Sequence, residues 1–325
     1  MDAHKLHPWM TRADWRSLAP DWLWFDPAEW NAAPVRMPPV PVIAVGAAGD
    51  PRSDWADVTV EGPAALPSLT RAIDRAPRTA AIIVHLLRIS GAMEPMAALT
   101  AESLAFGTLQ NGREHLGWLA GRDAPLRPPP AGSLQLRRER RVLTVTLDRP
   151  AAGNAIDRVM RDALYDAFAL AAFDATIEEI HLQAEGRCFS LGADLAEFGT
   201  TRESVDAHLI RMRTLPAWPL LEGGRRLITH VRGACVGAGL ELAAFSHRLT
   251  AAPNAWFQLP ELRMGLLPGF GGTVSLPRRI GRQAACRLIL SGRRIGAREA
   301  LAIGLIDVIV GDPPFDQRQR DGGAV

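Results

Sequence analysis

The sequence has little of several residue types, and each shortage excludes a class of protein. Only three cysteines occur in 325 residues, Cys188, Cys235 and Cys286, and no two of them form a CxxC pair. We therefore expect neither a metal site nor a disulfide framework, and interpret the three as reduced thiols. No stretch of about 18 apolar residues could cross a bilayer, and the N-terminus has no apolar signal core. These absences predict a soluble, cytoplasmic protein without membrane contact.

The chain also has almost no net positive charge. The 37 Lys and Arg residues nearly balance the 35 Asp and Glu residues, and Lys5 is the only lysine. No stretch interleaves basic and aromatic residues, so no nucleic-acid partner is expected. The glycine-containing run 237–239 is followed by Leu242, where a dinucleotide fingerprint has its third small residue. No nicotinamide or flavin cofactor is therefore expected.

What is present is typical of a globular protein with a large core. Hydrophobic residues make up 47% of the chain and charged residues 22%, and the length leaves room for two domains. Residues 1–37 are rich in tryptophan, which is typical of a segment that wraps onto a domain or a neighbouring subunit. The patterns that follow predict strands at 42–45 and 58–60, a helix at 64–76, a buried strand at 81–87 and a helix at 101–120. The loop 46–49 resembles a phosphate loop only loosely and is interpreted as a plain turn.

Four prolines in the segment 122–132 predict a semi-rigid linker and a domain boundary. We therefore divide the chain into a small α/β domain (1–132), a second domain (133–310) and a polar tail (311–325). The second domain begins with a predicted hairpin (134–138 and 142–147), a long amphipathic helix (154–173) and a strand (179–182).

The most informative stretch runs from residue 232 to residue 273. A strand-like segment at 227–231 enters a loop of small residues at 233–239, and an apolar run at 240–245 begins a helix with Glu241 in its first turn. The first turn of a helix has unpaired N–H groups and the positive end of the helix dipole. Small residues there let a ligand oxygen approach the backbone, so the turn suits a developing negative charge. Residues 186–195 form a second turn of small residues that is predicted to lead into a helix.

A second acid, Glu261, follows Pro260 and the strand-like segment 256–259. Two carboxylates beside an anion-accepting turn suit the addition or removal of a proton next to a carbonyl group. Each acid alone also has a structural explanation, because the dipole favours Glu in a first helical turn and Pro-Glu is common in turns. Together, between two similar turns, they favour catalysis.

Four motifs in this order resemble the crotonase superfamily, the enoyl-CoA hydratases and isomerases. They are LDRPAAGNAI (147–156), GRCFSLGADL (186–195), the stretch 232–273, and the stretch 276–310. The resemblance covers residues 134–310 and implies a right-handed spiral of ββα turns. The expected fold class is thus α/β, a crotonase-like spiral preceded by a small α/β N-terminal domain.

The resemblance also implies roles for individual residues. Glu241 and Glu261 correspond to the two acids of the hydratases, and the backbone N–H groups of Leu191 and Ala238 to the donors that form the oxyanion hole. Further substrate contacts are implied on the two turns, at Gly192, Ala193, Asp194 and Gly237. The implied substrate is an acyl-CoA thioester, whose coenzyme A is part of the substrate, so no separate cofactor is expected.

The implied reaction is hydration of a 2-enoyl-CoA, and alternatives stay open. They are an isomerase or retro-aldol-type lyase acting on CoA thioesters, and a weakly catalytic acyl-CoA-binding subunit. The family resemblance also implies a homo-oligomer, a trimer or dimer of trimers. Leu191 replaces a smaller family residue and is expected to narrow the acyl pocket. The family's C-terminal helices have no counterpart here, and we expect the N-terminal domain to take their place.

Overall fold

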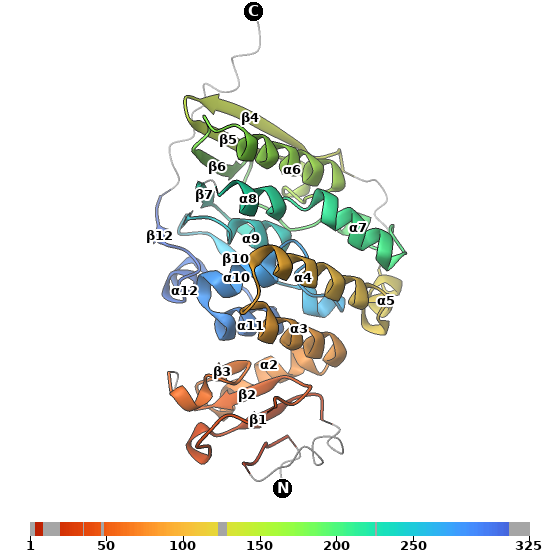
Figure 1. Ribbon diagram of the computed structural model, residues 1–325, viewed down its shortest axis with the longest axis vertical. Helices are drawn as coiled ribbons and strands as arrows, with labels where there is room; N and C mark the ends of the chain where they lie inside the picture. The colour runs from red at the N-terminus through yellow and green to blue at the C-terminus, as the bar shows by residue number, and fades with distance from the viewer. Residues whose placement is uncertain are drawn as a thin grey trace, which may run out of the picture.

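The computed structural model describes residues 4–8, 20–34, 36–46, 49–122, 129–224 and 226–311. Figure 1 shows a small sheet at one end of the molecule, a larger sheet at the other, and layers of helices between them. Parts of four sequence predictions lie outside these ranges, namely the tryptophan-rich leader, the loop 46–49, the proline-rich linker and the polar tail.

The small sheet confirms the two predicted strands near the N-terminus and adds a third. Its order is β1 (Leu23–Phe25), β2 (Val42–Val45) and β3 (Val58–Val60), and all three strands are parallel. The ring of Phe25 stacks on that of Trp55, with centroids 4.1 Å apart, and packs edge-on against Trp30. Part of the leader therefore folds into the core of this sheet.

Four helices follow, and they correct two predictions. They are α2 (Leu66–Ile73), α3 (Pro77–Ser90), α4 (Pro95–Gln110) and α5 (Arg113–Ala120). The predicted buried strand at 81–87 is part of α3. Its fully buried residues Ala80, Ile83, Val84 and Leu87 recur at helical spacing, and Pro77 starts the helix where a missing N–H costs nothing.

The helix predicted at 101–120 is two helices, α4 and α5. The Glu94 carboxylate caps the start of α4 by accepting hydrogen bonds from the N–H groups of Met96 (2.8 Å) and Ala97 (3.3 Å). The chain breaks at Gly112, whose N–H turns back to the carbonyl of Leu109 at 2.8 Å. Apolar periodicity continues across this turn, which is why the two helices look like one in the sequence.

The large sheet has the order β12-β9-β7-β6-β5-β4. Strands β4 (Ser133–Glu139) and β5 (Val142–Asp148) form the predicted antiparallel hairpin, and every other pairing in the sheet is parallel. The remaining strands are β6 (Glu179–Ala184), β7 (Arg226–Val231), β9 (Arg248–Ala251) and β12 (Val308–Ile309). Parallel neighbours require crossovers, which here wind the chain into successive strand–helix turns.

The crossovers supply the remaining elements. The predicted long helix is α6 (Arg158–Phe173), which begins when Asp157 accepts a hydrogen bond from the Met160 N–H at 2.8 Å. The turn 186–195 leads only into a 3-10 turn (Leu195–Glu197), not into the predicted helix. Helices α7 (Ser204–Thr214) and α8 (Ala217–Gly223) then lead to β7.

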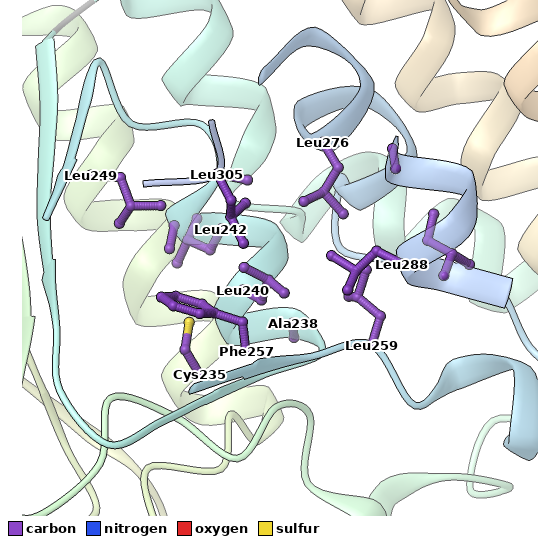
Figure 2. Close-up of a cluster of buried hydrophobic side chains, with 14 of the residues drawn as sticks. Cys235, Ala238, Leu240, Leu242, Leu249, Phe257, Leu259, Leu276, Leu288 and Leu305 are labelled. Atoms are coloured by element: carbon purple, nitrogen blue, oxygen red, sulfur yellow. The ribbon is translucent and has the colours of Figure 1, made fainter. Parts of the chain in front are cut away.

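A second three-stranded sheet holds the central stretch of the sequence. Its strands are β8 (Ala234–Val236), β10 (Trp256–Gln258) and β11 (Ile295–Gly296), and the helices around it are α9 (Ala238–Ala243), α10 (Gly272–Ile280), α11 (Arg282–Ser291) and α12 (Ala297–Ala302). Figure 2 shows Leu240, Leu242, Phe257 and Leu276 converging around α9.

The N-terminal helices pack directly on this region. Helices α3 and α4 contact α10, α2 and α3 contact α11, and α4 contacts α7. One continuous group of buried side chains runs from Ile43 in β2 to Ile306 near the end of the described chain. Helix α4 is thereby brought beside the turn that carries Glu241.

Candidate active site

The turn between β8 and α9 depends on a glycine. Gly237 has φ of 47° and ψ of −125°, a conformation that other residues rarely adopt. A Cβ at this position would lie only 2.7 Å from Oε1 of Glu261. The glycine therefore lets the backbone of the turn approach the second acid closely.

Glu241 lies in the first turn of α9 and is almost fully buried. Its Oε2 accepts hydrogen bonds from the N–H groups of Phe270 (2.6 Å) and Gly272 (2.9 Å). Burial raises the pKa of Glu241 well above its usual value, and the nearby charges of Glu261 and Glu102 raise it further. The two N–H donors oppose this change, because they stabilise the ionised carboxylate.

Glu261 opens the 3-10 turn Glu261–Met264 after β10. It is 8% exposed, and its Oε2 has no hydrogen-bond partner among the described residues. Burial raises the pKa of Glu261 to about 8. A buried carboxyl with an unsatisfied oxygen is expected to hold its proton near neutral pH.

A third buried acid, Glu102 of α4, was missed in the sequence. Its carboxylate accepts hydrogen bonds from the Gly271 N–H (2.7 Å), the Thr273 N–H (2.9 Å) and the Thr273 hydroxyl (2.6 Å). Burial raises the pKa of Glu102 to about 7. Glu102 and Glu241 thus bind alternate N–H groups of one glycine-rich segment, 270–273, from opposite parts of the chain. No sequence signal linked the glycines of this segment to position 102.

The structure corrects the assignment of one oxyanion donor. The Leu191 N–H donates to the carbonyl of Gly153 at 2.9 Å, so this N–H is not available to a substrate. The two residues on either side of Ala193 both bond to Ile156: the carbonyl of Gly192 accepts from the Ile156 N–H, and the Asp194 N–H donates to the carbonyl of Ile156. The intervening Ala193 N–H therefore faces away from Ile156, and no acceptor is recorded for it in the described chain.

The Ala238 N–H is also without a recorded acceptor among the described residues, as expected for the first residue of a helix. Gly192 connects the two turns, because a Cβ there would lie 3.0 Å from the Val236 carbonyl oxygen and 3.6 Å from Ala238 N. Its φ of 93° reverses the chain at this contact. In the described chain, the unoccupied N–H groups on the two turns therefore include those of Ala238 and Ala193, and the Leu191 N–H is not among them.

Asp194, predicted to contact substrate, has a structural role in the described contacts. Its carboxylate accepts from the Arg149 guanidinium at 2.8 Å and from the Ala196 N–H at 2.9 Å. Leu191 is 49% exposed and lines the pocket, and its side chain fills the space above Gly153. Whether it narrows the space for an acyl group stays a prediction.

The two acids and the two turns meet in one pocket of about 180 Å³. Its walls are mainly apolar and include Phe106 of α4, the two turns and residues of the segment 264–270. The lining residues include Phe106, Leu191, Gly192, Ala193, Phe198, Arg211, Leu215, Gly237, Ala238, Glu241 and Glu261. Phe106 comes from α4 and lies against Gly269, where a Cβ would meet its ring at 2.3 Å. An apolar pocket with buried acids and free N–H groups suits a thioester.

Comparison with known proteins decides the family. Residues 137–321 match the family model described as enoyl-CoA hydratase/isomerase. The chain belongs to the enoyl-CoA hydratase/isomerase family. It is 37% identical over 168 residues to a probable enoyl-CoA hydratase of Bacillus subtilis, covering 51% of this chain and 65% of that protein. It is 36% identical over 181 residues to the 2,3-dehydroadipyl-CoA hydratase of Escherichia coli, covering 55% of this chain and 70% of that protein.

Solved structures of the enoyl-CoA hydratase/isomerase family confirm the crotonase fold. A putative enoyl-CoA hydratase/isomerase (crotonase) from Legionella pneumophila matches with a TM-score of 0.51 and 27% identity, covering 55% of this chain and 70% of that one. An enoyl-CoA hydratase/carnithine racemase from Magnetospirillum magneticum matches with a TM-score of 0.51 and 31% identity, covering 55% and 68%. The chain thus spans about two thirds of the length of its relatives, and the family match does not include the N-terminal helices.

Among the described residues, no cluster of three or more His, Cys, Asp or Glu side chains is arranged to hold a metal ion. None of the helices that the structure describes is both long and apolar enough to span a membrane.

Proposed function

We propose that this family member hydrates the 2,3 double bond of a 2-enoyl-CoA thioester. One observation carries the proposal: two buried glutamates with different hydrogen-bonding environments share a pocket with two free backbone N–H groups. The N–H groups of Ala193 and Ala238 would bind the thioester oxygen, on which negative charge develops. One such donor typically lowers a barrier by about 3–4 kcal/mol.

The two acids have separable roles in this proposal. Two N–H donors hold the Oε2 of Glu241 and oppose the rise that burial causes in its pKa, and we assign Glu241 as the acid that takes the proton of a water molecule as its oxygen attacks C3. Glu261, whose Oε2 is unsatisfied and whose pKa is raised to about 8, keeps its proton and delivers it to C2. Each proton transfer of this kind contributes about 100- to 10,000-fold to the rate.

The experiment follows the loss of enone absorbance of crotonyl-CoA with the full chain. Glu241→Gln and Glu261→Gln are each expected to lower kcat at least about 100-fold while crotonyl-CoA binding persists. Glu197→Gln is a matched control, because Glu197 lines the same pocket but forms an ion pair with Arg158 at 3.1 Å. Near-normal hydration by either of the first two variants would remove that residue from the mechanism.

An isomerase is the alternative within the family, because the matching family comprises both hydratases and isomerases. Isomerisation needs proton transfer but no water, and the same two acids could perform it. A 3-enoyl-CoA offered in the same assay separates the two reactions: conversion to the 2-enoyl-CoA without hydration would replace the proposal by isomerisation. Binding without turnover of either ester would indicate an acyl-CoA-binding subunit.

A further inference from the structure

The charged residues that line the pocket are paired, with one exception outside the two catalytic glutamates. Arg158 forms an ion pair with Glu197 at 3.1 Å, and Arg161 forms one with Asp162 at 2.7 Å. Arg211 also lines the pocket, yet it lies within ion-pair distance of no described carboxylate. It lines the adjoining cavity of about 180 Å³ as well, so its side chain stands between the two spaces.

The Arg211 side chain is held in place from one edge. Its Nε donates to the Ser103 hydroxyl at 3.0 Å, and its Nη2 donates to the Ser103 carbonyl at 3.1 Å. The guanidinium lies over the ring of Phe106, 4.4 Å from the centroid. Ser103 and Phe106 both belong to α4, so the N-terminal part of the chain orients a cation from α7.

The opposite edge of the guanidinium remains open. Arginine has five N–H donors, and the contacts to Ser103 use two of them. The other three donors, two on Nη1 and one on Nη2, have no acceptor among the described residues, and one from each nitrogen lies along the edge that Nη1 and Nη2 share. That edge has the fork geometry that binds a carboxylate through two parallel hydrogen bonds. Burial lowers the pKa of Arg211 to about 10, so the group stays charged at neutral pH.

The surroundings favour a ligand that is part of the acyl group. Phe106, Phe198 and Leu215 line the pocket together with Arg211 and give it apolar walls, which suit methylene groups. A neutral chain end beside Arg211 would displace water from the cation without supplying a counter-ion, which is costly. Glu102 is the acid whose charge acts on the pKa of Arg211, but its carboxylate already accepts three hydrogen bonds from residues 271 and 273.

We propose that Arg211 binds a carboxylate at the far end of the acyl group, so that the substrates are CoA thioesters of unsaturated dicarboxylic acids. This inference rests on the proposed hydratase function and deepens it by naming the substrate class. Arg211 touches the substrate's distal end and not the reacting carbons, so it determines specificity and leaves the chemistry to the two glutamates.

The test compares binding of saturated, unreactive esters by calorimetry with the full chain. Glutaryl-CoA and adipyl-CoA carry the carboxylate, and valeryl-CoA and hexanoyl-CoA are the neutral esters of equal length. The wild type is expected to bind one of the dicarboxylic esters roughly 10- to 100-fold more tightly than its neutral counterpart. Arg211→Gln is expected to abolish that preference while binding of the neutral esters persists. Arg213→Gln, at an exposed arginine of the same helix, is expected to keep it.

Several results would overturn the proposal. If the wild type binds the dicarboxylic and the neutral esters equally well, the proposal is wrong, and this result does not depend on whether the variants fold. Equal weakening of both ester series and of free coenzyme A in Arg211→Gln would place a CoA phosphate on this arginine instead. An unchanged preference in that variant would leave Arg211 with a structural role only. Crotonyl-CoA hydration, assayed in parallel, reports separately on the proposed function, because binding of the saturated esters requires no turnover.

Discussion

Glu102→Ala is the perturbation that most sharply examines how the N-terminal helices support the site. The substitution removes the acceptor for three buried donors, the N–H of Gly271 and the N–H and hydroxyl of Thr273. Each buried donor left without a partner costs about 1–3 kcal/mol, and three donors that share one acceptor do not add fully. We expect a loss of about 3–5 kcal/mol in the free energy of unfolding.

The same substitution is expected to slow hydration in the molecules that remain folded. The turn that Glu102 holds also supplies the Gly272 N–H to Glu241 at 2.9 Å. When that turn loses its acceptor, the donors that favour the ionised form of Glu241 are no longer fixed. We expect kcat to fall about 10-fold or more, because small misplacements of catalytic groups reduce rates strongly. Urea denaturation and the crotonyl-CoA assay measure the two effects.

Glu114→Ala is a matched control on the neighbouring helix α5. Glu114 also accepts three hydrogen bonds, from the Arg78 N–H (3.0 Å), the Thr79 N–H (2.9 Å) and the Thr79 hydroxyl (2.6 Å), but it caps α3 and does not line the pocket. Its loss is expected to cost about 1–2 kcal/mol of stability with kcat unchanged. A Glu102→Ala protein that is as stable as wild type, or destabilised but fully active, would refute the reasoning.

Three further outcomes are expected. Ala238→Pro deletes the proposed donor at a helix position where proline is tolerated, so activity should disappear from a folded protein, whereas Ala238→Gly keeps the N–H and should stay active in the same assay. Gly237→Ala places a Cβ 2.7 Å from the Glu261 carboxylate and should cost about 1–3 kcal/mol in the free energy of unfolding and most of the activity. Gly296→Ala is the control, because a Cβ at Gly296 has no neighbour within 4 Å, and its urea denaturation should match that of the wild type. Burial raises the pKa of Glu261 to about 8 and of Glu102 to about 7 from a usual 4.5, so the folded state binds protons that the unfolded chain releases. Stability from these groups should be greatest below about pH 5 and fall towards pH 8 in urea titrations, less steeply in Glu261→Gln; a rise over this range would contradict the burial of both acids.

The sequence predicted the part of the fold in which patterns are local. The hairpin, the strands β6 and β7 and the turn before α9 follow from alternation, small residues and the four family motifs, whereas β9 and β12 were not predicted. Residues 81–87 were predicted as a strand because seven apolar or neutral residues suit both a buried strand and about two turns of a buried helix. Only packing against α10 and α11 distinguishes the two.

The sequence placed Glu241, Glu261 and Ala238 on elements that the structure brings into one pocket, and their catalytic roles stay predictions. The Leu191 N–H, predicted as the second donor, is bonded to the carbonyl of Gly153, and the unoccupied N–H that the structure describes on that turn lies two residues later, at Ala193. Successive N–H groups in a turn point in different directions, and the φ of 93° at Gly192 that sets those directions is not visible in a sequence. Glu102 could not be found at all, because its contact with Gly271 joins positions 169 residues apart.

The central claim is the addition of water to an enoyl thioester, and product analysis tests it most directly. The full chain is incubated with crotonyl-CoA in water enriched in the heavy oxygen isotope, and the CoA ester is examined by mass spectrometry. The account predicts a 3-hydroxybutyryl-CoA that carries the heavy isotope on C3, formed by the wild type and not by Glu241→Gln. A product of unchanged mass, or a folded protein that binds crotonyl-CoA and forms no hydrated product, would contradict it.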